Sequence, residues 1–404
     1  ATTEIYTLSL HDALPISIFD EQDEKALLEV FRSGVWGLGG ESTGKFAAHF
    51  AAYQGAKYGV TVCNGTVSLM VALRALGIGA GDEVIVPAYT FLATASAVLE
   101  VNGIPVFVDI DPDTYCMDPK KIEEVITSRT KAIIPVHIAG QPADMDAIMD
   151  IARKYDLAVL EDSAQAHGAE WRGKRVGSIG DIGSFSFQSS KNLSCGEGGA
   201  LITNSEELFD KCYSFHDCGR RRGGAKYEHH VLGQNFRLSH IHAAILMSQM
   251  DRLDEQINLR NENGRYLAEA LSKIEGIRPL MNDERTTRHG YHLFIFRYNR
   301  EGFKGIPREQ FLKALGAEGI PCSKGYVPLY REPLFAIEAQ DCPLSCKFYE
   351  GTMDYSKVNC PQTEKAADEE GVWLPQNLLL GTKEDMDSIV EAVVKIQENA
   401  SELE

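Results

Sequence analysis

One lysine lies in a setting that could make it chemically reactive. Lys191 follows an alternating apolar run that ends at Phe187, and serines surround it. Gly196-Glu-Gly-Gly199 then predicts a turn before a second strand at residues 200–203. Serine hydroxyls can bind a phosphate, and a buried lysine can lose its proton and form a Schiff base. The ordinary alternative is a solvated surface lysine.

An acidic residue upstream could complete a cofactor site. Asp162 ends an apolar stretch at residues 157–162, and ligands bind at the carboxyl ends of strands in open α/β sheets. Its carboxylate could pair with the protonated ring nitrogen of pyridoxal 5'-phosphate (PLP). Taken alone, an aspartate after a strand is more often a helix N-cap. Its distance from Lys191 favours the aspartate and lysine of a PLP enzyme with the aspartate-aminotransferase fold.

Three motifs extend this pattern. They read Glu161-Asp162-Ser-Ala-Gln165-Ala-His-Gly168, Ser184-Phe-Ser-Phe-Gln-Ser-Ser-Lys191 and Gly196-Glu-Gly-Gly199. Together they resemble the DegT/StrS family of sugar and cyclitol aminotransferases, and the resemblance runs from about Ile18 to Lys395. It implies a fold type I PLP-dependent transferase: an α/β protein with a mostly parallel central sheet, a smaller C-terminal α+β domain and a homodimeric assembly.

The resemblance also assigns site residues. It implies that Lys191 and Asp162 are catalytic: Lys191 holds PLP and shuttles a proton, and Asp162 keeps the ring nitrogen protonated. Gln165 would lie beside the ring hydroxyl, and Phe91 would stack on the ring. The residues expected at the phosphate are Thr66, Val67, Ser186 and, reaching into the other subunit, Asn235. The residues expected at the substrate are Gln188, Arg220 and Tyr326.

The elements that must position these residues alternate along the chain. Strands are predicted at residues 58–63, 83–87, 106–111, 132–137, 157–162, 200–203 and 290–297. Helices are predicted at residues 19–33, 67–76, 120–127, 145–154, 206–216, 308–317 and 379–397, and at 241–274 with a break near the middle. This βαβ alternation indicates a mostly parallel sheet with helices on both faces. The turn at Asn64-Gly-Thr66 could present free N–H groups to a phosphate, although it also suits an ordinary connection.

The chain has 404 residues, which suggests two closely joined domains. We expect a large PLP-binding domain at residues 17–255 and a small C-terminal domain at residues 256–404.

Residues 1–16 read as the in-frame translation of a common short-read sequencing adapter, and a genuine N-terminal arm is the alternative. We expect this segment to contribute nothing to folding or catalysis.

Composition excludes several classes of partner. The net charge of −18 argues against nucleic acid and anionic membranes, which need basic faces. No apolar stretch is long enough to span a bilayer. The nine cysteines lack zinc-site spacing, and the histidines at 229, 230, 240 and 242 have no carboxylate at ligand spacing, so we expect no metal. Reduced thiols favour a cytoplasmic location.

The predicted activity is PLP-dependent transfer of an amino group from glutamine or glutamate to a keto-cyclitol or keto-sugar. The segment Gly140–Asp146 and Gln188 look closest to members that act on cyclitols. The cluster Arg220–Arg222 favours the alternative, a nucleotide-linked keto-sugar, because it could hold a diphosphate. A PLP dehydratase would have histidine in place of Lys191. Lys191, Asp162 and Thr66 together argue against a non-catalytic scaffold.

Overall fold

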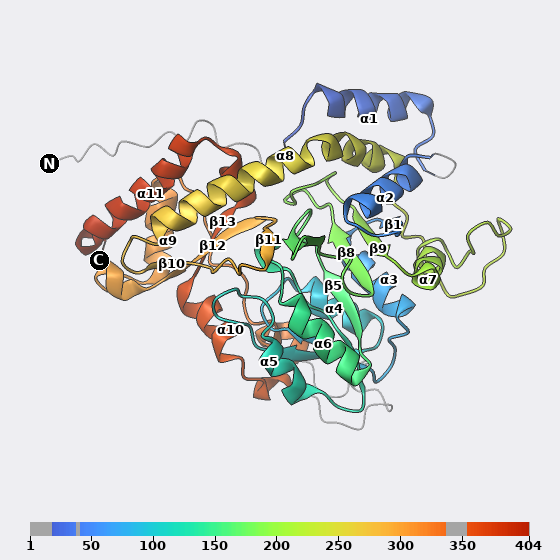
Figure 1. Ribbon diagram of the computed structural model, residues 1–404, viewed down its shortest axis with the longest axis horizontal. Helices are drawn as coiled ribbons and strands as arrows, with labels where there is room; N and C mark the ends of the chain where they lie inside the picture. The colour runs from blue at the N-terminus through green and yellow to red at the C-terminus, as the bar shows by residue number, and fades with distance from the viewer. Residues whose placement is uncertain (1–17, 38–40, 337–353, 404) are drawn as a thin grey trace.

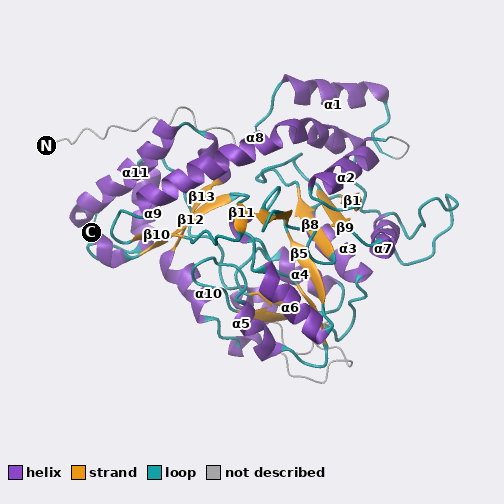
Figure 2. Ribbon diagram, viewed as in Figure 1, coloured by secondary structure: helices purple, strands orange, loops and turns teal. Residues whose placement is uncertain are grey.

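A computed structural model describes residues 18–37, 41–336 and 354–403 of the chain (Figure 1). The adapter-like segment at residues 1–16 lies outside the described residues. Figures 1 and 2 show a central sheet flanked by helices, and a smaller sheet that packs with helices near the C-terminus. A long helix runs along one side of both parts.

The central sheet has seven strands in the order β1-β9-β8-β5-β4-β2-β3. From β8 to β3 all neighbours are parallel, and β9 lies antiparallel between β8 and β1. This confirms the predicted mostly parallel sheet. The strands are β1 (Tyr58–Val62), β2 (Glu83–Pro87), β3 (Ile104–Val108), β4 (Thr130–Ile133), β5 (Ala158–Asp162), β8 (Ile182–Ser186) and β9 (Gly199–Thr203). β4 ends earlier than predicted, just before Pro135, which has no N–H for a sheet hydrogen bond.

Apolar side chains cover both faces of this sheet. Successive residues of β2 point to opposite faces, so Val84 and Val86 join the cluster under α3, while Ile85 joins the cluster under α6. This two-sided burial explains why the strands are continuously apolar. The helices around the sheet are α2 (Ser42–Tyr53), α3 (Gly65–Ala75), α4 (Ala93–Glu100), α5 (Pro119–Ile122), α6 (Met145–Tyr155) and α7 (Glu206–His216).

The long helix α8 (His240–Leu271) is continuous over 32 residues, so the predicted break near its middle is wrong. The helix contains no proline, and its single glycine, Gly264, has a packing role. A Cβ at Gly264 would lie 2.5 Å from the ring of Tyr291. Helix α1 (Glu21–Ser33) packs along α8, where Arg252 pairs with the capping residue Asp20 at 3.0 Å (Figure 1).

A second sheet has the order β10-β12-β13 and is antiparallel. Its strands are β10 (Ile277–Pro279), β12 (Leu293–Tyr298) and β13 (Gly371–Pro375), and it shares an apolar core with α9 (Arg308–Ala317) and α11 (Lys383–Glu398). Helix α11 begins later than the predicted start at residue 379, because a 3₁₀ turn and a capping box at Thr382 precede it. The domain boundary at residues 255/256 falls inside α8 and stays a prediction.

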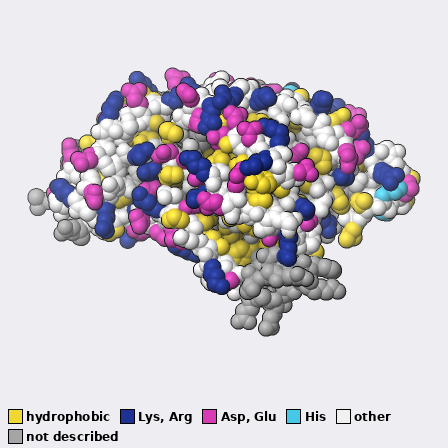
Figure 3. All heavy atoms as spheres, turned by 60° about the horizontal axis from the view of Figure 1, so that its bottom comes forward, with side chains coloured by type: hydrophobic (Ala, Val, Ile, Leu, Met, Phe, Trp, Pro, Cys, Tyr) yellow, Lys and Arg dark blue, Asp and Glu magenta, His cyan; other side chains and the backbone are white. Residues whose placement is uncertain are grey.

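A third small sheet and a short helix also belong to the described chain. The short strands β6 (Glu170–Trp171), β7 (Lys174–Arg175) and β11 (Thr286–Arg288) form a third sheet, and α10 is Pro361–Lys365. On the face shown in Figure 3, Lys and Arg side chains are interspersed with Asp and Glu side chains, so opposite charges lie close together there. Among the described residues, no helix combines the length and apolar character that crossing a bilayer requires.

Candidate active site

The structure brings Asp162 and Lys191 to the same edge of the central sheet. Asp162 ends β5, and Lys191 lies in the loop after the neighbouring strand β8. The Asp162 carboxylate is buried and accepts hydrogen bonds from Thr94 Oγ1 at 2.8 Å and from the N–H of Ala164 at 3.2 Å. The sequence analysis missed Thr94, although it stands in the segment that also contains Phe91.

The surroundings shift the pKa values of both Asp162 and Lys191. Burial raises the pKa of Asp162, while the hydrogen bond from Thr94 and the nearby charge of Lys191 act in the opposite direction. Burial also lowers the pKa of Lys191 to about 8, and the attraction of Asp162 partly opposes this. About a tenth of Lys191 is therefore uncharged at pH 7, far more than for a solvated lysine, and the uncharged amine is the form that a nucleophile or general base requires.

A phosphate-sized cradle lies where α3 begins. The first turn of a helix presents N–H groups without intrahelical partners. Here the N–H of Val67 donates to the Asn64 side chain at 2.9 Å, which leaves the N–H groups of Gly65 and Thr66 as the ones that can face a ligand. A Cβ at Gly65 would lie 2.7 Å from the Cβ of Ser186, so only glycine lets the helix approach that serine. The turn Asn64-Gly-Thr66, which the sequence suggested as a phosphate site, therefore lies against Ser186, and Gly65 makes this close approach possible.

Gln165 and Tyr326 also meet, although they are far apart in the chain. Gln165 Oε1 accepts from the N–H of Ala139 at 2.6 Å, and Gln165 Nε2 donates to the Tyr326 hydroxyl at 3.0 Å. The Tyr326 ring packs edge-on against Trp373 at 4.7 Å between centroids and lies 6.2 Å from Phe91. Phe91 is 57% exposed, so its ring is free to stack on a flat ligand.

Two of the residues predicted to bind substrate or cofactor make other contacts in this chain. Gln188 Oε1 accepts hydrogen bonds from Ser190, and Gln188 Nε2 donates to Ser189 Oγ at 2.8 Å, so its amide braces the Lys191 loop. Asn235 is exposed beside a cavity of about 330 Å³ that Arg237 also lines. Within the described part of the chain, no hydrogen bond or ion pair joins Asn235 to Lys191.

The basic cluster is neutralised by acidic neighbours. Arg220 pairs with Asp217 at 3.1 Å and donates to the Lys226 carbonyl at 2.7 Å. Arg222 pairs with Glu206 at 2.9 Å and with Asp210 at 3.0 Å, both on α7. Two of the three arginines are therefore held by carboxylates of the same chain.

A buried carboxylate supports the whole site. Glu161 has no exposed surface, and it accepts hydrogen bonds from the N–H groups of Gly177, Ile179 and Gly180 at 2.6–2.7 Å. It also accepts from His137 Nε2 at 3.0 Å. Glu161 was part of a motif in the sequence, but its structural role depends on residues that no local pattern connects to it.

The donor set fits PLP. A buried carboxylate suits a protonated ring nitrogen, and the lysine has a lowered pKa. The start of α3 and the Ser186 hydroxyl suit a phosphate, and an exposed aromatic ring lies close by. The fold and this set of groups define a fold type I PLP-dependent enzyme.

The chain belongs to the DegT/DnrJ/EryC1/StrS aminotransferase family, whose profile matches residues 17–394. This confirms the predicted family and fold, and the protein is a PLP-dependent aminotransferase. A protein of Streptoalloteichus tenebrarius is 44% identical over 394 residues, covering 95% of this chain and 94% of its own, and is provisionally named as an L-glutamine:3-amino-2,3-dideoxy-scyllo-inosose aminotransferase.

A further relative and a solved structure are also similar to this chain over most of their length. The L-glutamine:2-deoxy-scyllo-inosose aminotransferase of the same organism is 39% identical, covering 94% of this chain and 92% of its own. The crystal structure of 3-amino-5-hydroxybenzoic acid synthase superposes with a TM-score of 0.85 at 34% identity and covers 94% of this chain and 97% of its own.

The Glu161 network yields a stability prediction. In Glu161→Gln, an amide NH₂ replaces one carboxylate oxygen and faces N–H donors, so buried donors lose their acceptor. We expect the free energy of unfolding to fall by about 3 kcal/mol or more, measured by urea denaturation. Glu207→Gln, an exposed partner of Lys211 on α7, is the matched control and should change little. A loss no larger than that of the control would contradict the supporting role.

Proposed function

We propose that this chain transfers an amino group from L-glutamine or L-glutamate to a keto-cyclitol, with Lys191 and Asp162 as its catalytic residues. The observation that carries the proposal is the placement of these two residues together at the carboxyl edge of β5 and β8, with the pKa of Lys191 lowered to about 8. The names of the relatives, which specify L-glutamine and inososes, support both substrates.

Lys191 has two tasks in this proposal. Its uncharged Nζ would hold PLP at the aldehyde carbon, and with an amino donor in the site the same Nζ would be free to take the proton from the donor carbon. The bound cofactor supplies an electron-accepting ring. Asp162 keeps the ring nitrogen protonated, and Thr94 fixes the orientation of the Asp162 carboxylate. The ketone is then aminated by the reverse steps.

In this proposal Thr66 and Ser186 hold the cofactor phosphate, together with Asn235 of the partner subunit. Val67 lies in the same helix turn, but its N–H already donates to Asn64. Asn235 is exposed, and within the described residues no hydrogen bond joins it to its own Lys191, which fits a role across an interface. Exposed apolar side chains precede it, with Leu232 at 78% exposure. A homodimer that covers this surface would bring Asn235 to the second site.

The remaining cofactor and substrate roles follow from position. Gln165, with Tyr326 as its hydrogen-bond partner, would bind the ring hydroxyl, and Phe91 would stack on the ring. Gln188 and Tyr326 line the substrate mouth. Arg220 would have to leave Asp217, which holds its guanidinium, in order to bind the substrate.

A neutral polyol is favoured over a nucleotide-linked sugar. A diphosphate needs free cations, and Arg220 and Arg222 are already paired with carboxylates. A polyol instead needs hydroxyl and amide partners, and unpaired partners would reject a poorly matched ketone strongly.

The organisation and location complete the proposal. The large domain comprises residues 17–255 and the small domain residues 256–404, with α8 as the shared connection. The protein works in the cytoplasm, which agrees with the seven cysteines of the described residues, all of them free thiols.

The first prediction concerns the lysine. Borohydride reduction of the purified protein should fix a phosphopyridoxyl group on Lys191, because its Nζ is the group with the lowered pKa beside Asp162. Peptide mass spectrometry locates the group. Lys191→Arg should carry none, and a label on another lysine would refute the assignment.

The second prediction concerns Asn235. Lys191→Ala and Asn235→Ala should each lose most activity as separate proteins. After subunit exchange, a mixed dimer has one site with an intact lysine and an intact Asn235 from its partner, so part of the activity should return. Activity assays with proven exchange test this, and no recovery would indicate a site contained within one chain.

The third prediction concerns the ketone. The enzyme loaded with pyridoxamine 5'-phosphate should convert scyllo-inosose, and nucleotide-linked keto-sugars should react far more slowly. The return of the visible absorbance of the aldehyde form measures each reaction. A response only to nucleotide sugars would overturn the cyclitol proposal and leave the aminotransferase assignment intact.

A further inference from the structure

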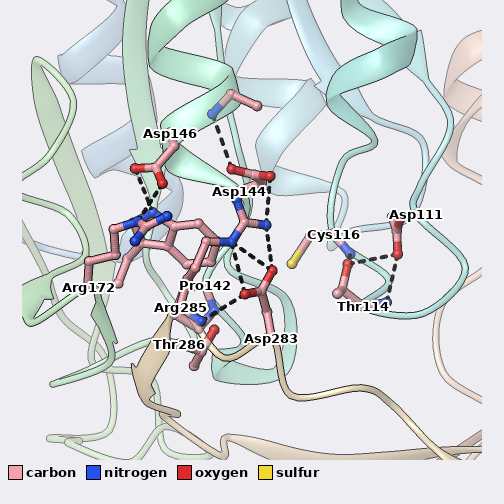
Figure 4. Close-up of polar contacts among 12 residues, drawn as sticks. Asp111, Thr114, Cys116, Pro142, Asp144, Asp146, Arg172, Asp283, Arg285 and Thr286 are labelled. Atoms are coloured by element: carbon pink, nitrogen blue, oxygen red, sulfur yellow. Dashed lines mark hydrogen bonds and ion pairs between the residues drawn. The ribbon is translucent and has the colours of Figure 1, made fainter.

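A segment between β10 and β12 crosses to the loops of the candidate site. Its strand β11 pairs with β6, and Arg285 accepts at its carbonyl from the N–H of Arg172 at 2.7 Å. Figure 4 shows the Arg285 side chain between Asp144 and Asp283, at 2.9 Å from the Asp144 carboxylate, beside the pair formed by Arg172 and Asp146. These contacts tie the segment to the start of α6 and to the β6–β7 turn.

Beyond β11 the segment makes a tight turn at His289–Tyr291, which is held in a strained shape. Tyr291 has a φ of 45°, a region that side chains other than glycine seldom adopt. Its N–H donates to His289 Nδ1 at 2.8 Å, and the two rings stack at 3.8 Å between centroids. Asn261 of α8 holds the turn by two hydrogen bonds to His289. Its Nδ2 donates to the carbonyl at 2.6 Å, and its Oδ1 accepts from the N–H at 3.0 Å.

The tip of this turn, Gly290, is seated between the loops of the site. Its N–H donates to the Gly140 carbonyl at 2.8 Å, and its carbonyl accepts from Asn192 Nδ2 at 2.6 Å. A Cβ at Gly290 would lie 3.1–3.2 Å from Gly140, from Ala166 and from the Gln165 carbonyl. The turn therefore touches the residue next to Lys191 and the segment that contains Gln165.

We propose that Asn192 is a positioning residue that latches the Lys191 loop to Gly290 and so holds the Lys191 amine towards Asp162. The latch consists of Asn192, Gly290 and Gly140. The inference rests on the proposed catalytic role of Lys191. Asn192 is buried, and within the described part of the chain its Oδ1 accepts no hydrogen bond, so the donation to Gly290 is what fixes the side chain.

The latch has a chemical consequence because of what surrounds Lys191. Asp162 is the acidic group that acts on it, and the buried rings of His167 and His292 are also close enough to interact with it electrostatically; the guanidinium of Arg260 acts on the two rings. Burial lowers the pKa of His167 to about 3 and that of His292 well below its ordinary value, so both rings are neutral. A loop released from Gly290 would let the Lys191 amine move towards water, and its pKa would rise towards 10.5.

The test compares Asn192→Ala with Asn263→Ala. Asn263 is also buried, lies on α8 and donates to two main-chain carbonyls, those of Leu379 and Gly381, so the control removes similar bonds away from the latch. Both proteins are loaded with pyridoxamine 5'-phosphate, which leaves the Lys191 amine free. The rate at which an amine-reactive reagent labels Lys191 is then measured by mass spectrometry at a series of pH values. The pH at the midpoint of this rate curve gives the pKa of Lys191, whereas accessibility changes only the height of the curve.

We expect Asn192→Ala to raise this midpoint by about one unit or more and to lower kcat by roughly ten- to a hundredfold with KM for the donor nearly unchanged. Hydrogen exchange of residues 187–198 should also accelerate. Gly290→Ala should reproduce these effects, because the added methyl group pushes the turn away from Gly140. This variant replaces Asn192→Ala in the test if Asn192→Ala does not fold.

A midpoint, kcat and exchange rate that match those of Asn263→Ala in both latch variants would overturn the inference. A phosphopyridoxyl group found on a lysine other than Lys191 in the wild-type protein would instead refute the proposed function. The two failures are therefore distinguishable.

Discussion

The architecture of the site depends on one buried carboxylate. Glu161 lies on β5 directly before Asp162, and its oxygens take the N–H groups of the turn at residues 177–180 that leads into β8. It also accepts a hydrogen bond from His137. The Nδ1 of this ring accepts from the N–H of Ala143, so its Nε2 carries the hydrogen that it donates to Glu161. In this way one side chain fixes three segments: the strand with Asp162, the strand that leads to Lys191 and the turn that binds Gln165. A carboxylate without solvent contact is stable here because four donors replace its water shell.

Asp162 and Lys191 are also desolvated, but unlike Glu161 they have few hydrogen-bond partners that offset the loss of water. Their pKa values therefore move towards each other instead of apart. The free energy that Glu161 and the sheet core contribute allows this less favourable arrangement to persist. A lysine with a lowered pKa is reactive for the same reason that it is costly to bury.

Charge pairing also bears on specificity. In the basic cluster Arg220–Arg222, two of the three arginines pair with carboxylates of α7 and of the adjoining loop. The pairing of Arg220 and Arg222 leaves these two cations less available to an anionic ligand, which agrees with the neutral ketone that we propose as substrate. The turn at Gly290 and the network in Figure 4 show, in addition, that the loops around the site are braced by a segment far along the chain.

The sequence alone determined the class of fold and the alternation of strands and helices along the chain, and it predicted Asp162 and Lys191 as a catalytic pair. Those features follow from local periodicity and from motifs of adjacent residues, which a single stretch of chain carries in full. Only the tertiary structure decided that α8 is continuous, that Gln165 meets Tyr326 and that Thr94 holds Asp162. It also decided that the arginine cluster is paired and that Asn192 binds Gly290. Each of these depends on residues that are distant in the chain and become neighbours only when the whole fold is packed, so no local pattern could predict them.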